Sequence, residues 1–172
     1  MDTVEVSETF RWEQRTYDIM LQYLPRTYSI LDFQNKRQST AAIDALVVRD
    51  GRIQFAVEQK TRNMSDWELA NYGDELVINN AKWLNLKKTA EVLNVDVWMW
   101  TMMKKSDMVI ATKMFNANAV PVAKCHFERG NYQHSASNSE HLLKDVVLVD
   151  VSHSLKYYPE DSPNQTDTSQ TP

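Results

Sequence analysis

Two acidic residues and a lysine occupy positions where apolar side chains are expected. Asp44 interrupts the run AAIDALVV at residues 41–48, and Glu58 interrupts IQFAVEQK at residues 53–60. Both runs are rich in apolar and β-branched residues, which indicates strands. A carboxylate inside such a strand is costly unless a cation or hydrogen bonds compensate its charge. Lys60 lies two residues after Glu58, so both side chains project from the same face of their strand.

The turn between the two runs decides whether all three charged side chains meet. The pair Asp50-Gly51 between two β-rich runs is the strongest short-range signal for a β-hairpin. A two-residue loop pairs Val48 with Ile53, and the two carboxylates then fall on opposite faces. This is the first of two possible registers.

The second register uses a three-residue loop over residues 49–51, with the glycine in the left-handed conformation of a bulge. It pairs Val48 with Arg52 and sets Asp44 opposite Ala56, diagonal to Glu58 on the same side. The opposite face of the hairpin is then fully apolar. We favour this register because it separates the apolar side chains from the ionic ones.

Carboxylates a few ångströms apart repel one another unless a cation lies between them. Oxygen-only ligation suits Mg²⁺ or Mn²⁺, with water completing the coordination. A lysine beside such an ion can orient an attacking water or stabilise the negative charge that grows on a phosphoryl group. The pattern therefore predicts a metal site for phosphoryl chemistry.

A helix is expected over residues 7–24, before the hairpin. Its apolar residues recur at spacings of three and four, and Pro25 ends it. Glu13 lies within this apolar stripe, where a free carboxylate needs a partner, so it is a candidate for a further metal ligand. Glu8 competes for the same role.

The other expected elements follow from periodicity and turn signals. Ser65 and Glu68 form a capping-box pattern at the start of a long helix. The order is helix, three strands, helix and one or two strands, which is an α/β sandwich plan. The expected helix covers residues 66–93, either continuous or interrupted near Gly73. The other ranges are strands over 28–33, 95–102, 108–114, 122–127 and 146–151, a polar loop over 130–139 and a disordered tail over 157–172.

A strand aspartate, a β-turn and then hydrophobic-E-x-K resemble the PD-(D/E)XK nuclease superfamily. The resemblance implies an α/β fold, a three-layer α/β/α sandwich with a mixed central sheet and an αβββαβ core. By position, Asp44 is the motif aspartate, Glu58 and Lys60 form the E-x-K pair, and Glu13 is the glutamate of the first helix. The resemblance implies Mg²⁺ or Mn²⁺ held by these carboxylates and by the backbone carbonyl of Gln59.

The resemblance covers roughly residues 7–115 and extends beyond the motif. Glu68-Leu-Ala-Asn-Tyr72 is similar to the Q-x-x-x-Y element of the exonuclease-like branch, with glutamate in place of glutamine. Glu68 and Tyr72 are therefore candidate substrate contacts, and Lys82 on the second helix is another. Ile43 stands where the motif often has proline.

The resemblance implies hydrolysis of DNA phosphodiester bonds, with Lys60 assisting the attacking water, by an endonuclease or an exonuclease. Because little of the chain lies outside the catalytic core, we expect a homodimer or a partner protein to supply further contacts to the DNA. The resemblance also implies a setting in a phage or in bacterial defence, repair or recombination. A second hypothesis is a catalytically inactive nuclease-fold module that binds nucleic acid or a partner protein. A third is a metal hydrolase that uses His126 and His134.

Composition narrows the alternatives. The chain has 172 residues and three widely spaced glycines, so it contains no glycine-rich nucleotide loop, and its lone cysteine excludes an internal disulfide. The net charge of −4 comes from acidic ends, which leaves residues 9–156 slightly positive, so nucleic acid is not excluded. The acidic start and the lack of a long apolar run predict a cytoplasmic protein. We expect one domain over 1–156, with an extension over 116–156.

Overall fold

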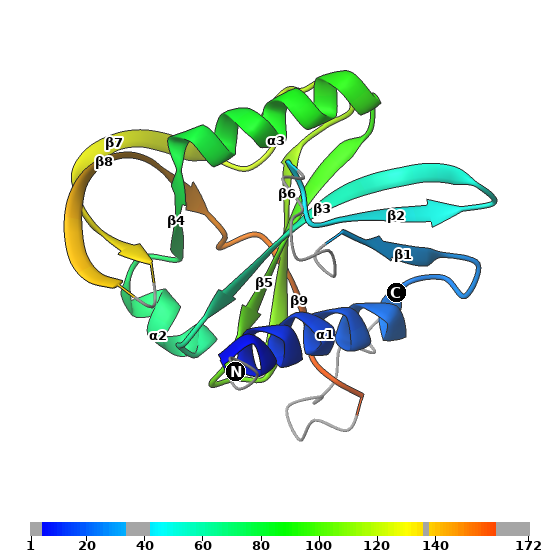
Figure 1. Cartoon of the computed structure of the whole chain (residues 1–172), viewed down its shortest axis with the longest axis horizontal. Coiled ribbons are helices and arrows are strands. Elements are labelled where there is room, and N and C mark those ends of the chain that lie inside the picture. Colours follow the sequence, from blue (N-terminus) through cyan, green and yellow to red (C-terminus); the bar gives the residue numbers. More distant parts are fainter. Residues whose placement is uncertain (1–4, 34–41, 136–137, 161–172) are drawn as a thin grey trace, which may run out of the picture.

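The computed structural model describes residues 5–33, 42–135 and 138–160. The chain forms three helices and nine strands within these ranges (Figure 1). In chain order they are α1 (Glu5–Tyr23), β1 (Ser29–Asp32), β2 (Ala45–Arg49), β3 (Arg52–Arg62), α2 (Asp66–Asn71), β4 (Glu75–Asn79), α3 (Asn80–Leu93), β5 (Asp96–Met103), β6 (Met108–Phe115), β7 (Cys125–Ser135), β8 (Asn138–Asp150) and β9 (Leu155–Tyr157).

The apolar strands pair into a mixed six-stranded sheet with the order β1-β2-β3-β5-β6-β9. β1, β2 and β3 form an antiparallel meander, β3 and β5 are parallel, and β6 is antiparallel to β5. The chain passes through α3 between the two parallel strands, as a parallel crossover requires. Figure 1 shows α1 and α3 on opposite sides of this sheet. The α/β/α sandwich and the αβββαβ core order are therefore confirmed.

Each face of the sheet has its own core. On the face covered by α1, here called the α1 side, Tyr17 and Ile19 pack against Val57 and Trp100. On the other face, the α3 side, Leu86 packs among side chains from β3, β5 and β6. Successive strand residues point to opposite faces, so the apolar β3 and β5 runs are buried on both sides.

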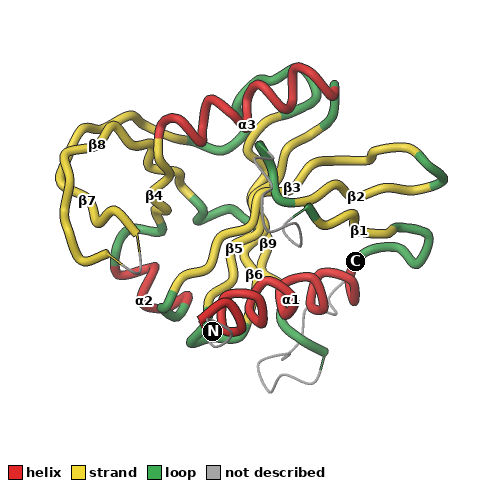
Figure 2. The backbone as a smooth tube through the Cα atoms, viewed as in Figure 1, coloured by secondary structure: helices red, strands yellow, loops and turns green. Residues whose placement is uncertain are grey.

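A second, three-stranded sheet has the order β4-β8-β7 and packs beside α3 (Figure 2). The helix expected over 66–93 is interrupted near Gly73, the alternative that the sequence left open, because Gly73 and Asp74 adopt positive φ and the ELVIN segment pairs with β8 as strand β4. One expectation was wrong here. The polar stretch over 130–139 is largely strand rather than loop, since β7 and β8 form one long hairpin.

Most of the boundaries predicted before residue 116 agree within a few residues. The strands predicted over 122–127 and 146–151 are longer in the structure, because β7 continues to Ser135 and β8 begins at Asn138. The predicted strand over 41–48 begins only at Ala45. Tyr157, placed in the tail, ends β9. Most of the predicted tail, residues 161–172, lies outside the described residues. None of the helices in the described ranges is long and apolar enough to cross a membrane.

The β2–β3 hairpin differs from the favoured register. Its loop has two residues, Asp50 and Gly51, both at positive φ, as a type I′ turn requires. A bulge follows, because Val48 pairs with Ile53 while Val47 pairs with Phe55. The extra residue in β3 restores the alternation that the two-residue loop alone would have reversed.

Candidate functional site

Glu58 is the buried centre of the site. It lies on the α3 side of β3 and is 1% exposed. Its two carboxylate oxygens accept hydrogen bonds from different lysines, Lys60 on the same strand at 2.8 Å and Lys82 on α3 at 3.1 Å. Burial raises the pKa of Glu58, the positive charge of Lys60 opposes that shift, and Asp44 adds to it. The arrangement is a buried carboxylate between two ammonium groups.

Asp44 lies next to Glu58 at the start of β2. Ala45 pairs with Val57, so Asp44 comes level with Glu58 rather than with Ala56, the position expected from the favoured register. Its carboxylate accepts the backbone N–H of Gln59 at 2.7 Å. The N–H and C=O of one strand residue point to the same side, so the Gln59 carbonyl also faces the side of Asp44.

A second group of acids lies on the α1 side of the same position. Burial raises the pKa of Glu13 to about 7, and the negative charges of Asp44 and Asp32 add to the shift. The pKa of Tyr17 is raised for the same reasons, and its hydroxyl donates to Asp32 at 3.4 Å. Each of these shifts has burial and negative neighbours as its causes, without a lysine or arginine among them.

Gln59 connects the two groups. Its side-chain amide nitrogen donates to the backbone carbonyl of Glu13 at 3.4 Å, and its side-chain oxygen is buried without a hydrogen-bond partner in the described part of the chain. A buried acceptor of this kind is normally satisfied by water or an ion. It lies beside an excess of negative charge at Glu13 and Asp44.

These residues fit a hard divalent cation. Asp44, Glu58 and the Gln59 carbonyl offer only oxygen, which is what Mg²⁺ and Mn²⁺ prefer. No cluster of three or more histidine, cysteine, aspartate or glutamate side chains within metal-binding range occurs in the described ranges. Two carboxylates and water satisfy Mg²⁺, which usually keeps several waters. Lys60 and Lys82 supply positive charge to Glu58 on the α3 side of the sheet.

The other predicted residues are placed as follows. Glu68 completes the capping box of α2, accepting the N–H of Ser65 at 2.7 Å, and it also pairs with Lys105 at 2.6 Å. Its carboxylate is thus engaged, whereas Tyr72 is 73% exposed. Glu8, the rival of Glu13, pairs with Lys104 at 2.8 Å.

For the hypothesis of a histidine-based metal hydrolase, the described part of the chain shows two weak contacts of His126. His126 lies 3.5 Å from Glu75 and 3.9 Å from Glu128 on the second sheet. The side chain of His134 lies outside the described residues.

Sequence reasoning missed Asp32 as part of the site. It ends β1 and pairs with Ala45, directly beside Asp44. The available signal was an acidic residue inside the strand-like segment YSILDF, the same signal that identified Asp44.

No protein-family model matches the chain, and no curated protein matches it. Among solved structures, the protein is similar to Hjc, a Holliday junction resolvase from the archaeal hyperthermophile Archaeoglobus fulgidus. The TM-score is 0.42 with 11% sequence identity, over 60% of this chain and 75% of that chain.

Proposed function

We propose that the protein is a metal-dependent nuclease that hydrolyses DNA phosphodiester bonds at the site around Glu58. One observation supports this most strongly. A fully buried strand glutamate is held next to Asp44 and is hydrogen-bonded by Lys60 from its own strand, in the E-x-K spacing. Burying such charges on a central strand costs free energy of folding, and groups with strongly perturbed pKa values are concentrated at functional sites.

The charged side chains of the site have different roles in the proposed reaction. Lys60 is partly exposed, so its ammonium can reach a phosphoryl oxygen and stabilise the charge that grows there. Glu58 fixes the position of that ammonium. Asp44, Glu58 and the Gln59 carbonyl would hold Mg²⁺, and Glu13 would hold or position a second ion. When bound, the metal supplies positive charge and lowers the pKa of a water molecule.

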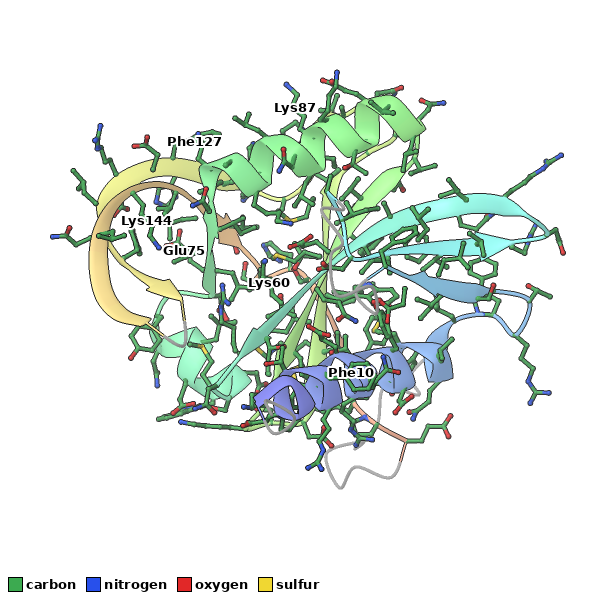
Figure 3. All side chains as sticks on the ribbon, viewed as in Figure 1. Phe10, Lys60, Glu75, Lys87, Phe127 and Lys144 are labelled. Atoms are coloured by element: carbon green, nitrogen blue, oxygen red, sulfur yellow. The ribbon has the colours of Figure 1, made fainter. Side chains whose placement is uncertain are left out.

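The test is cleavage of labelled single- and double-stranded DNA with Mg²⁺, Mn²⁺ or EDTA. We expect cleavage with either metal and none with EDTA. Lys60→Ala should abolish most of it, while Lys87→Ala, a matched lysine on the outer side of α3 (Figure 3), should not. Cleavage that persists in EDTA, or that is unchanged in Lys60→Ala, would contradict the proposal.

The second candidate is a catalytically inactive module of the same fold. It is favoured by the two lysines on Glu58, which neutralise this carboxylate without a metal. DNA binding without cleavage under every metal condition would support this candidate over the nuclease.

A further inference from the structure

A third cationic residue continues the line of Glu58 and Lys60. Alternate residues of β3 face the α3 side, so Arg62 follows Lys60 on that face. Four residues of strand separate Arg62 from Glu58, which is about 13 Å at the rise of a β-strand. The guanidinium therefore lies at a distance that a neighbouring nucleotide of a bound strand can reach.

Arg62 has neutral hydrogen-bond partners. Its two terminal nitrogens donate to backbone carbonyls, one to Thr61 at 3.3 Å and the other to Val77 on β4 at 3.0 Å. Burial lowers its pKa, and no carboxylate in the described part of the chain counteracts that shift. Guanidinium groups that are largely removed from solvent are normally paired with an anion, and the half-buried guanidinium of Arg62 has N–H groups beyond the two that donate to these carbonyls.

The guanidinium lines a cavity of about 260 Å³ between the end of β3, α2 and the second sheet. The other walls are mostly apolar, and they include Met64, Leu69, Val77 and Leu148. Tyr72 also lines the cavity and is 73% exposed, so its ring is available at the rim.

One carboxylate lines the cavity. Glu75 lies on β4, where it is labelled in Figure 3, and it is 3.5 Å from His126 on β7. It is not among the causes of the lowered pKa of Arg62. The cavity therefore combines one half-buried cation, apolar walls and an exposed aromatic ring.

We propose that this cavity binds a phosphate group of a nucleic-acid strand through Arg62, with the attached nucleoside packed on Tyr72. The proposal rests on the proposed function, because it assigns the cavity to the strand that reaches Glu58. A guanidinium donates to phosphate oxygens through paired N–H groups, and an aromatic ring stacks on any base.

The test is fluorescence anisotropy in EDTA, where no cleavage occurs, with a 3′-labelled single-stranded oligonucleotide. Arg62→Gln should weaken binding at least about 10-fold and lower the slope of log Kd against log salt by about one. Arg52→Gln, an exposed arginine on the same strand, should change Kd less than twofold. Equal binding by Arg62→Gln and wild type, or an equal loss in Arg52→Gln, would overturn the proposal.

Two sources of the phosphate are distinguished by the oligonucleotide. If the effect of Arg62→Gln disappears when the 5′-phosphate is removed, the cavity binds a terminal phosphate. If the effect is the same with and without it, the cavity binds an internal phosphodiester.

Exposed Tyr72 provides a variant that does not depend on a buried residue. Tyr72→Ala should weaken binding severalfold while Tyr72→Phe, which keeps the ring, stays within twofold of wild type. Arg62→Lys keeps the charge but loses the planar fork, so it should bind better than Arg62→Gln. Binding by Tyr72→Ala equal to that of Tyr72→Phe would contradict the stacking role.

Failure of this proposal differs from failure of the proposed function. If Lys60→Ala abolishes cleavage but Arg62→Gln binds normally, the nuclease stands and the phosphate cavity is wrong. If the protein never cleaves DNA but Arg62→Gln binds weakly, the cavity stands and the nuclease is wrong.

Discussion

The two sides of the central sheet treat buried negative charge in different ways at the same position. On the α3 side, Glu58 has an ammonium group on each oxygen. On the α1 side, Glu13 lies near Asp32 and Asp44. Burial and the negative charges of these two aspartates raise the pKa of Glu13. Within the described residues, Glu58 is therefore paired with two cationic side chains, whereas Glu13 has acidic side chains as the charged neighbours that raise its pKa.

This difference indicates which carboxylates are paired with lysines of the protein and which are available to a metal ion. The lysines on the α3 side fix Glu58 in place, since both of its oxygens are hydrogen-bonded. The acidic neighbours that raise the pKa of Glu13 favour its protonation or the binding of a cation. We therefore expect opposite responses when a carboxylate is removed from each side.

The largest expected effect is on catalysis. Lys60→Ala removes the ammonium that can reach substrate, so we expect the rate of DNA cleavage to fall about 10²- to 10³-fold. Single-turnover cleavage with saturating Mg²⁺ measures this. A loss of similar size in Lys87→Ala would show instead that general positive charge is responsible.

Removing the carboxylate on the α3 side should destabilise the protein. Glu58→Gln leaves two ammonium groups facing an amide, which costs stability because two ion pairs are lost. The raised pKa of Glu58 means that its buried charge already costs stability, and the lysines reach solvent in part, so we expect a net loss of no more than about 2 kcal/mol in the free energy of unfolding. Urea unfolding measures it. Glu91→Gln, which breaks the exposed pair with Lys88, is the matched control and should cost less than about 0.5 kcal/mol.

Added cation should act through Asp44, whose negative charge raises the pKa of both Glu58 and Glu13. At a Mg²⁺ concentration ten times its Kd, we expect stabilisation by about 1.4 kcal/mol, seen as a Tm higher by about 3–5 °C. Asp44→Asn should remove most of this rise. The same rise in Asp44→Asn would place the ion elsewhere.

Removing a carboxylate on the α1 side should stabilise the protein, and only at higher pH. The pKa of Glu13 is about 7 in the fold against 4.5 for the free group, so the folded state binds the extra proton between these values. The stability of the wild type therefore falls as pH rises from about 4.5 through 7.

Glu13→Gln removes that loss. With EDTA present, we expect it to be more stable than wild type by about 1 kcal/mol at pH 8, after allowing for solvent screening, and equal to wild type near pH 4. Thermal unfolding at both pH values measures it. A Glu13→Gln protein that is less stable than wild type at pH 8 would break the contrast between the two sides.

The sequence predicted the layers and the hairpin because strong alternation and the Asp50-Gly51 turn depend on local chemistry. It did not predict β4, since the ELVIN segment becomes a strand only by pairing with β8, about 70 residues later. It also offered the two-residue loop that forms but favoured the three-residue loop. That choice is set by a bulge in β3, which no local residue type signalled.

Of the candidate site, the sequence predicted the two acidic residues that interrupt apolar strands, Asp44 and Glu58, and the structure places them next to each other. The contact between Lys82 and Glu58 depends on how α3 crosses the sheet, which spacing alone does not give. Arg62 was missed for a related reason, because its burial depends on β4 and α2 closing over the end of β3.

The bulge after Ile53 determines which face of the sheet the Glu58 side chain occupies for a given length of the turn. Side chains along a strand alternate, so an insertion or deletion of one residue before Glu58 sends it to the other face, while a change of two keeps its face. The bulge in β3 is one such single-residue insertion, and it brings Glu58 level with Asp44, which directly precedes β2. Related sequences should therefore vary this hairpin in even steps, or gain and lose the bulge together with an odd change in the turn.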